Sequence, residues 1–236
     1  MPSASPRPRR RLFDLIVFDL DGTLVDSLQD LCDSANLLVA EYGGSPVERD
    51  QVARMVGEGA GVLVDRVIAA SGSKVDGAIA LARYLEIYGA HLLDRTRPYP
   101  GIPEFVRDVS QQVPLAVLTN KPRSAALPVL EGLGLAGSFR EIIGGDSGYP
   151  KKPDPASLLA VIGRAGASPE RTLYVGDSGV DLRTARNAGT PFCCARYGFG
   201  RVQFPDHEIG SRDWVVDSAF ELASVFRGTR PFGFPG

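Results

Sequence analysis

Two aspartates stand one residue apart directly after an apolar run, in the stretch FDLDG at residues 18–22. Residues i and i+2 of a strand lie on the same face, so the carboxylates of Asp19 and Asp21 start out pointing the same way. A charge placed directly after the apolar residues 15–18 costs free energy unless it has partners or a task. Gly22 then lets the chain turn away at once. We therefore predict that Asp19 and Asp21 are functional groups.

Further polar groups follow other apolar segments and complete the predicted site. They are Asp177 and Asp181 in and after TLYVGD, Thr119 and Asn120 at the end of PLAVLT, and Lys152 in the loop YPKKPDP. Open α/β sheets bind their ligands at the carboxyl ends of parallel strands. If these strand ends are neighbours, the site combines up to four carboxylates with a hydroxyl and a lysine.

Such a cluster of carboxylates predicts a cation. Two carboxylates about 5 Å apart repel by roughly 3 kcal/mol at an effective dielectric constant of about 20, so a cluster is not expected to stay ionised without one. Oxygen ligands, few in number and with room left for water and substrate, suit Mg²⁺. A metal between carboxylates favours an anionic substrate such as a phosphate ester, and lysine and hydroxyl donors would hold its remaining oxygens.

Several of these residues also have purely structural interpretations. Ser178-x-x-Asp181 has the pattern of a capping box for the helix that follows, and Asp181 can serve both purposes. Thr119 alone would merely end a strand, with Asn120 capping the next helix. Lys152 alone would be a solvated loop lysine. Each functional role requires that the strand ends meet at one site.

Short apolar segments alternate with helix-like stretches along most of the chain. Several segments are continuously apolar, as expected of strands covered on both faces. The predicted strands are residues 12–20, 114–119, 141–145, 172–177, 191–196 and 214–217. Asp154 followed by Pro155 predicts a helix with Asp154 as its N-cap, which ends at Gly166. The repeated strand–helix–strand order predicts a parallel α/β sheet.

One region, residues 27–97, breaks this alternation with helical periodicity and no good strand. We interpret it as a helical insert that leaves the sheet after the first strand and returns at the stiff segment PYPG, residues 98–101. The predicted division is a core of residues 12–25 and 98–226, a helical insert of residues 26–97, a disordered tail at 1–11 and a flexible tail at 227–236.

Composition argues against several classes of function. The chain has 236 residues, of which 44% are apolar and 23% charged, and its net charge is −2. This balance gives no support to nucleic-acid or membrane-surface binding. No apolar run approaches the roughly 18 residues that span a bilayer. Three cysteines without zinc-ligand spacing fit a reducing cytoplasm, where we expect a monomer or homodimer.

At four places the chain resembles the motifs of haloacid dehalogenase-like phosphotransferases. The matching segments are DLDGTLVDS at 19–27, LTNKP at 118–122, KPDP at 152–155 and GDSGVD at 176–181. The resemblance implies a Rossmann-like core with a helical cap inserted after the first motif. MVGEGAGVLVDR at 55–66 and RPYPG at 97–101 resemble the phosphoglycolate phosphatase branch, whereas CCAR at 193–196 and residues 203–212 depart from it.

The resemblance implies a chemical role for the aspartates. Asp19 would be the nucleophile that forms an aspartyl-phosphate, which divides one hard step into two. Asp21 would protonate the leaving alcohol and then take a proton from the hydrolytic water. The Asp19 side chain, the Asp21 backbone carbonyl and Asp177 would bind Mg²⁺. Gly22 would support this turn.

The same resemblance implies roles for the remaining predicted site residues. Thr119 and Lys152 would hold the transferring phosphoryl group, and Asn120 would add to substrate binding. Asp181 would support Lys152 or a metal-bound water. The cap would close over the site, exclude bulk water and read the organic part of the substrate.

The expected function is Mg²⁺-dependent hydrolysis of a small phosphorylated metabolite, with 2-phosphoglycolate as the first candidate. A sugar-phosphate mutase similar to β-phosphoglucomutase stays open, as does a phosphatase of another sugar phosphate or of pyrophosphate. A dehalogenase is disfavoured because its first motif lacks the second aspartate, here Asp21. A non-catalytic binding protein on the same fold is a more distant alternative, because the four motifs are intact.

Overall fold

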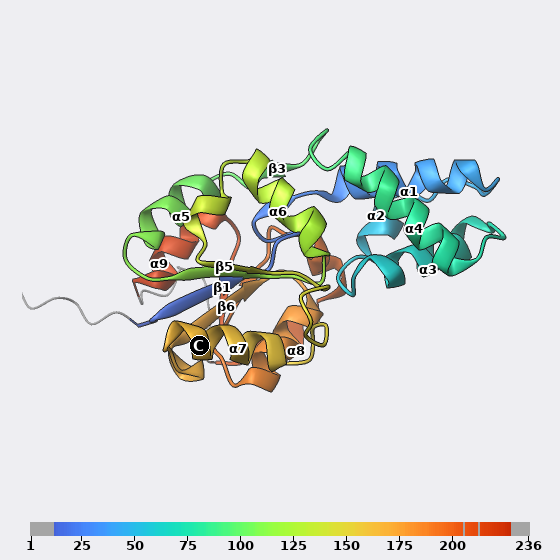
Figure 1. Ribbon diagram of the computed structural model, residues 1–236. Helices are drawn as coiled ribbons and strands as arrows, with labels where there is room; N and C mark the ends of the chain where they lie inside the picture. The colour runs from blue at the N-terminus through green and yellow to red at the C-terminus, as the bar shows by residue number, and fades with distance from the viewer. Residues whose placement is uncertain (1–11, 205, 212, 228–236) are drawn as a thin grey trace, which may run out of the picture.

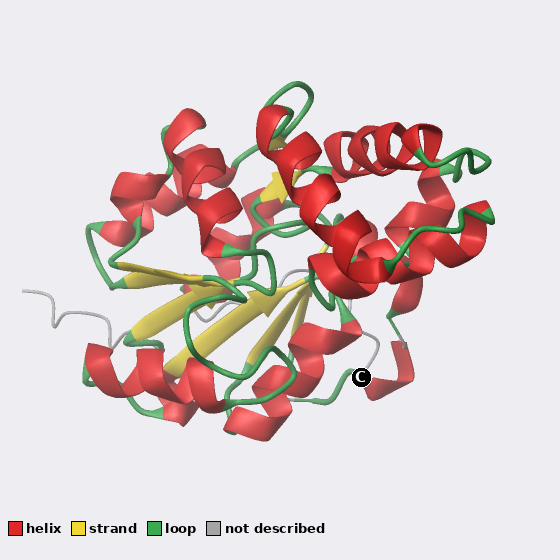
Figure 2. Ribbon diagram, turned by 45° about the vertical axis from the view of Figure 1, so that its right-hand side comes forward, coloured by secondary structure: helices red, strands yellow, loops and turns green. Residues whose placement is uncertain are grey.

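The computed structural model describes residues 12–204, 206–211 and 213–227 of the chain. Within them, six parallel strands form one sheet in the order β5-β4-β1-β6-β7-β8. The strands are β1 (Leu15–Phe18), β4 (Leu115–Leu118), β5 (Glu141–Ile143), β6 (Thr172–Gly176), β7 (Phe192–Ala195) and β8 (Trp214–Val216). Helices flank the sheet, and a further group of helices lies beyond its carboxyl ends (Figures 1 and 2). The predicted tails at 1–11 and 227–236 lie outside the described residues, apart from Arg227.

The strands are buried because helices pack on both faces of the sheet. Successive residues of a strand point to opposite faces, so Ile16 and Phe18 belong to one apolar cluster, and Leu15 and Val17 to another. One face carries α5 (Ile102–Ser110), α6 (Arg123–Gly132) and α9 (Leu222–Phe226), and the other carries α7 (Ala156–Ala165) and α8 (Gly179–Ala188). Both kinds of position must therefore be apolar, which explains the continuous apolar runs.

The strand order reverses at β1. From β1 the chain passes to β4 and β5 on one side, then returns to β6 on the other side and continues to β7 and β8. Such a reversal opens a crevice at the carboxyl ends of the strands on either side of it. The residues that follow these three strands, Thr119, Asp19 and Asp177, therefore end at one crevice.

Four of the described helices form the helical cap: α1 (Leu28–Glu41), α2 (Arg49–Ala53), α3 (Ala60–Ser71) and α4 (Gly77–Ala90). They share an apolar cluster distinct from the two on the sheet. The chain enters and leaves the cap through an antiparallel ribbon of β2 (Val25–Asp26) and β3 (Arg97–Pro98). The buried Asp30 carboxylate of α1 accepts hydrogen bonds from the backbone N–H groups of Arg95 and Thr96, so it ties the departing and returning segments together.

The α/β fold with a parallel sheet is confirmed, and all six predicted strands are present. Each strand is shorter than predicted, because residues such as Asp19 and Thr119 leave the strand to form the site. The β2–β3 ribbon was not predicted, since two-residue strands carry no periodicity. The start of α7 was wrong by one residue: Pro155 is its N-cap, and the carboxylate of Asp154 accepts from the N–H of Ala156 at 2.8 Å. Its predicted end at Gly166 is confirmed.

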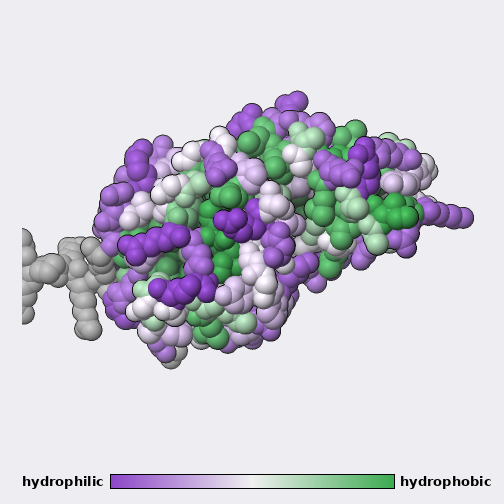
Figure 3. Space-filling view, viewed as in Figure 1, coloured by the Kyte–Doolittle hydropathy of each residue, from purple (hydrophilic) through white to green (hydrophobic). Residues whose placement is uncertain are grey.

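Short 3-10 helices complete the described part of the chain: η1 (Ala136–Ser138), η2 (Pro169–Arg171), η3 (Phe199–Gln203), η4 (Asp206–Glu208) and η5 (Ala219–Glu221). None of the described helices is both long enough and apolar enough to cross a bilayer. In the face that Figure 3 shows, hydrophobic residues gather over the cap at the right. Large apolar residues exposed on the cap are Leu37, Ile79 and Leu85.

Candidate active site

Three neighbouring strands deliver three polar side chains to one place. Asp19 follows β1, Thr119 follows β4 and Asp177 follows β6, and all three are buried. The backbone ladder continues up to them, since Asp19 N–H donates to the carbonyl of Val175 at 2.9 Å and Thr119 N–H to that of Ile143 at 3.0 Å. The sheet therefore holds these residues rigidly at the crevice, although they lie far apart in the sequence.

Lys152 reaches Asp19 from the loop between β5 and α7. Its ammonium Nζ lies 2.8 Å from Asp19 Oδ1 and 2.7 Å from Asp181 Oδ1, and its side chain is 3% exposed. Burial alone lowers the pKa of Lys152, but the carboxylates of Asp181 and Asp19 outweigh burial and hold that pKa well above its ordinary value. Lys152 is therefore a permanent cation between two carboxylates.

Asp181 both caps a helix and contacts Lys152, which are the two roles that its sequence position allows. It forms a capping box with Ser178 at the start of α8, as predicted. Its Oδ2 accepts from the N–H and hydroxyl of Ser178 at 3.1 and 2.6 Å, and its Oδ1 accepts from Lys152 Nζ and the Tyr174 hydroxyl. With both oxygens engaged, Asp181 fixes the position of Lys152.

Burial and neighbouring carboxylates raise the pKa values of Asp19 and Asp177. Burial raises the pKa of Asp19 to about 7; Lys152 opposes this rise, and the charge of Asp181 adds to it. Burial also raises the pKa of Asp177 well above its ordinary value, and the charges of Asp181 and Asp19 add to that rise. The cluster is therefore short of positive charge, although Lys152 already lies within it.

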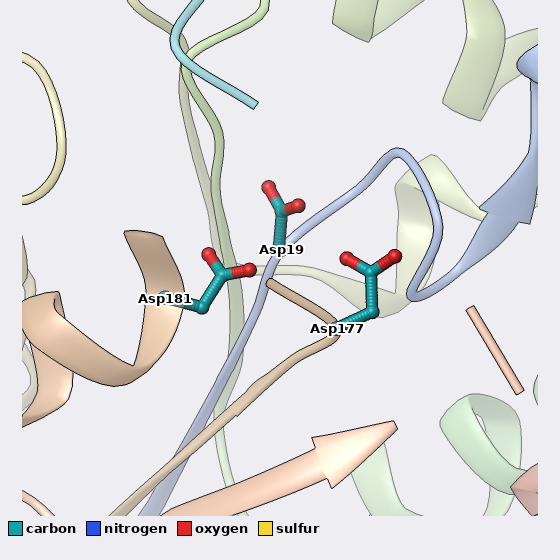
Figure 4. Close-up of side chains that lie close together, drawn as sticks. All are labelled: Asp19, Asp177 and Asp181. Atoms are coloured by element: carbon teal, nitrogen blue, oxygen red, sulfur yellow. The ribbon is translucent and has the colours of Figure 1, made fainter. Parts of the chain in front are cut away.

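A cation fits this cluster. One oxygen from each of Asp19, Asp177 and Asp181 lies within 4.8 Å of the others, and Figure 4 shows the three carboxylates side by side. Because Asp181 already accepts four hydrogen bonds, Asp19 and Asp177 have the oxygens left for a metal ion. A hard divalent cation binds a small set of oxygen ligands. Its charge would lower the raised pKa values of Asp19 and Asp177. The backbone carbonyl of Asp21, the third predicted ligand, belongs to the turn that follows Asp19.

Glycines surround Asp177 so closely that no side chain fits there. At Gly22, whose φ is +86°, an added Cβ would lie 1.9 Å from Asp177 Oδ2. At Gly198 and Gly200 an added Cβ would lie 2.5 and 2.8 Å from the same oxygen. The N–H of Gly200 donates to that oxygen at 2.7 Å. Gly22 thus allows both the turn after Asp21 and the approach of this turn to Asp177.

Asp21 turns toward the cap and has a lysine partner that was not predicted. Lys121 Nζ lies 2.9 and 3.1 Å from the two carboxylate oxygens of Asp21, and the Ser27 hydroxyl donates to Oδ1 at 2.5 Å. Lys121 also donates to the hydroxyl of Tyr88 in α4 and lies over its ring, 4.5 Å from the centroid. The sequence offered one indication, because Lys121 directly follows Thr119 and Asn120.

Thr119 and Asn120 differ in how they meet the site. The Thr119 hydroxyl oxygen accepts from the N–H of Lys121 at 3.2 Å and lines the crevice. Asn120 instead clamps Lys152: its Oδ1 accepts from the Lys152 N–H at 2.9 Å, and its Nδ2 donates to the Lys152 carbonyl at 3.0 Å. The same Nδ2 donates to the carbonyl of Gly57 in the cap at 2.9 Å. Direct binding of substrate by Asn120 stays a prediction.

A cavity of about 50 Å³ lies between the cap and the crevice. Its floor carries Asp19, Asp21, Thr119 and Asp177. Its cap side is largely apolar, with two buried tyrosines, and comprises Leu31, Val56, Gly57, Gly59, Ala60, Leu63, Tyr84, Leu85 and Tyr88. The tyrosines were not predicted as site residues; the four-residue spacing within ALARYLEIYGA, which puts them on one helix face, was the available indication.

Comparison with known proteins agrees with this geometry. A family model described as haloacid dehalogenase-like hydrolase matches residues 16–195. The phosphoglycolate phosphatase of Rhodospirillum rubrum is 42% identical over 194 residues, which are 79% of this chain and 80% of that protein. Phosphoglycolate phosphatase 1 of Pseudomonas aeruginosa is 40% identical over 207 residues, or 84% of this chain and 75% of that protein.

A solved structure agrees as well. The crystal structure of a protein described as a predicted phosphoglycolate phosphatase from Haemophilus somnus has a TM-score of 0.85 and 30% sequence identity to this chain. The match covers 91% of this chain and 98% of that one. The family model spans most of the chain and includes Asp19, Thr119, Lys152 and Asp177. This chain therefore belongs to the haloacid dehalogenase-like hydrolase family.

Proposed function

We propose that this protein is a Mg²⁺-dependent phosphatase of small phosphorylated metabolites, with 2-phosphoglycolate as its first substrate. The observation that carries the proposal is the pair Asp19 and Asp21 in one cavity, with Asp177 beside Asp19 and Lys152 bonded to it. The relatives named phosphoglycolate phosphatase support the choice of substrate, since they match this chain over most of its length.

In this proposal Asp19 is the nucleophile. Its carboxylate oxygen forms a bond to phosphorus while the bond from phosphorus to the alcohol oxygen of the substrate breaks, and water then releases phosphate from the aspartyl-phosphate. Asp19, Asp177 and the backbone carbonyl of Asp21 would hold Mg²⁺, which would supply the positive charge that lets an anionic nucleophile meet an anionic ester. Lys152 and the Thr119 hydroxyl would hold the phosphoryl oxygens.

Asp21 is the proton carrier in this proposal. It gives a proton to the leaving alcohol and takes one from the hydrolytic water. Lys121 and Ser27 fix its carboxylate on the cap side of the crevice, where the leaving group would lie. We propose that residues 26–97 act as a cap that opens on the β2–β3 ribbon to admit substrate and closes to exclude bulk water.

The small free space between cap and crevice favours a small ester over the substrate of a sugar-phosphate mutase. A mutase must hold a sugar that carries two phosphates, which needs more room than a small ester, and the free space here is about 50 Å³. We also propose that the enzyme works in the cytoplasm as a monomer or homodimer, without nucleic-acid partners.

The test is phosphate release by the purified protein from a panel of phosphorylated metabolites, with Mg²⁺ and with excess EDTA. We expect 2-phosphoglycolate to be cleaved most efficiently, and we expect the chelator to abolish turnover. Asp19→Asn, which removes the nucleophile but keeps the shape, should be inactive. Faster cleavage of another metabolite would overturn the substrate alone. Full activity of Asp19→Asn, or full activity in EDTA, would overturn the mechanism.

A further inference from the structure

Two tyrosines of the cap line the cavity opposite the aspartates. Tyr84 and Tyr88 stand four residues apart in α4 and therefore lie on the same helix face. Their rings stack with centroids 5.8 Å apart and an interplanar angle of 9°, and both side chains are buried. The stacked rings form part of the cap side of the cavity.

The two hydroxyl groups differ in their partners. That of Tyr88 accepts a hydrogen bond from Lys121 Nζ, whereas that of Tyr84 is buried and finds no hydrogen-bond partner among the described residues. Buried tyrosine hydroxyls usually have a partner, because burying one without it costs about 1–3 kcal/mol. Because Tyr84 lines the substrate cavity, its unpartnered hydroxyl is a candidate donor to a bound ligand.

The surroundings of Tyr84 define the ligand. Burial raises the pKa of Tyr84 well above its ordinary value, Tyr88 adds to the rise and Lys121 opposes it, so the phenol keeps its proton and can donate. Among the described residues that line the cavity, Lys121 carries the one positive charge. A donor next to a cation suits an oxygen that carries negative charge. Lys121 is shared with the carboxylate of Asp21 and the hydroxyl of Tyr88, whereas Lys152 is held between Asp19 and Asp181.

We propose that Tyr84 recognises a carboxylate at the end of the substrate remote from the phosphoryl group, next to the ammonium of Lys121. The substrate class is then the phosphate ester of a short hydroxy acid, with the phosphoryl group at Asp19 and the acid at the tyrosine wall. This inference rests on the proposed phosphatase function and adds to it the residue that selects acidic substrates from neutral ones.

The experiment compares Tyr84→Phe, which removes the hydroxyl and keeps the ring, with wild type on two esters. The esters are 2-phosphoglycolate and ethyl phosphate, in which a methyl group replaces the carboxylate. We expect the ratio of kcat/KM values, acid over neutral ester, to fall by about 10- to 100-fold, as for a lost hydrogen bond to a charged group. Tyr42→Phe, in the cap but outside the cavity wall, should keep the wild-type ratio. An unchanged ratio in Tyr84→Phe would overturn the inference.

A binding measurement separates this inference from the proposed function. In an Asp19→Asn background, which binds without turnover, calorimetry should find 2-phosphoglycolate bound more tightly than ethyl phosphate. Adding Tyr84→Phe should remove most of that difference. Equal binding of the two esters to the Asp19→Asn protein would overturn the role of Tyr84, whatever the activity of wild type. A different result is that the Asp19→Asn protein prefers 2-phosphoglycolate and loses that preference with Tyr84→Phe, while wild type cleaves neither ester. That result would leave the role of Tyr84 standing and overturn the proposed function.

Discussion

Lys152 lies between the buried carboxylates of Asp19 and Asp181 and offsets the repulsion between them. Replacing it by methionine keeps the length of the side chain and leaves Asp19 and Asp181 without their shared cation. We expect the kcat of Lys152→Met to fall by about 10²–10³, as for the loss of one charged donor to a transition state. The measurement is phosphate release at saturating Mg²⁺ and substrate.

The neighbouring Lys151 is the matched control for Lys152. It belongs to the same loop but is exposed to solvent, so Lys151→Met should keep a kcat close to that of wild type. If both methionine variants were equally active, Lys152 would be a structural lysine with no part in the reaction.

A substitution at Gly22 tests how closely the turn after Asp21 must approach Asp177. A Cβ at this position overlaps Asp177 Oδ2, so Gly22→Ala should push this carboxylate aside. We expect a higher Mg²⁺ concentration for half-maximal activity and a lower kcat. Gly43→Ala is the control: its φ of +67° is equally left-handed, but an added Cβ has nothing within 4 Å. That variant should cost about 1–2 kcal/mol in free energy of unfolding and leave the Mg²⁺ requirement unchanged.

Three of the predicted site residues share a property that the missed tyrosines lack. Asp19, Thr119 and Asp177 directly follow apolar strands, so strand polarity alone places them at one edge of the sheet. Tyr84 and Tyr88 belong to a helical cap whose docking onto the sheet depends on long-range packing. On a helix, tyrosines at four-residue spacing also resemble ordinary core positions, so the pattern alone did not distinguish a cavity wall from a core.

At the scale of elements, Asn120 connects the cap to the loop that carries Lys152. One side-chain amide bonds both the Lys152 backbone and the carbonyl of Gly57, so cap closure and the position of the lysine depend on each other. Asn120→Asp replaces the donor Nδ2 by an oxygen that would face two carbonyls. We expect a lower kcat and faster amide hydrogen exchange in the cap loop around residues 55–59.

Asn187 provides the matched control for Asn120. Its Nδ2 donates to the carbonyl of Pro153 at 2.9 Å, in the same loop but away from the cap. Asn187→Asp should leave exchange around residues 55–59 unchanged. If exchange there were as slow in Asn120→Asp as in wild type, Asn120 would hold the lysine loop without any link to the cap.

The elements themselves were predictable wherever a pattern ran over several residues. Continuous apolar runs in several segments indicate strands covered on both faces, and all six predicted strands are present in the sheet. The ribbon β2–β3 was missed because each of its strands has two residues, and its pairing depends on the cap leaving and returning at one place. The hydrogen bonds to Asp30 were unpredictable for the same reason. A carboxylate in a helix does not reveal that it will accept from the backbone of residues 95 and 96.

At the scale of the whole molecule, the raised pKa of Asp19 couples folding to pH. The pKa of Asp19 is about 7 in the fold against an ordinary value of 3.8. Between these pH values the folded protein binds more protons than the unfolded chain. The free energy of unfolding of the metal-free protein should therefore receive a contribution that falls as pH rises through this window. Asp177 acts in the same direction, because its pKa is also raised.

A divalent cation should reverse this loss, because it supplies at high pH the positive charge that protons supply at low pH. We expect Mg²⁺ to raise the Tm, measured against EDTA by thermal unfolding, more at about pH 8 than at about pH 5, where protons compete for the same carboxylates. Asp19→Asn removes one of these titrating groups and should reduce both the pH dependence of the metal-free Tm and the effect of Mg²⁺. A Mg²⁺ effect of equal size at both pH values, or one that Asp19→Asn leaves intact, would show that the cation binds elsewhere.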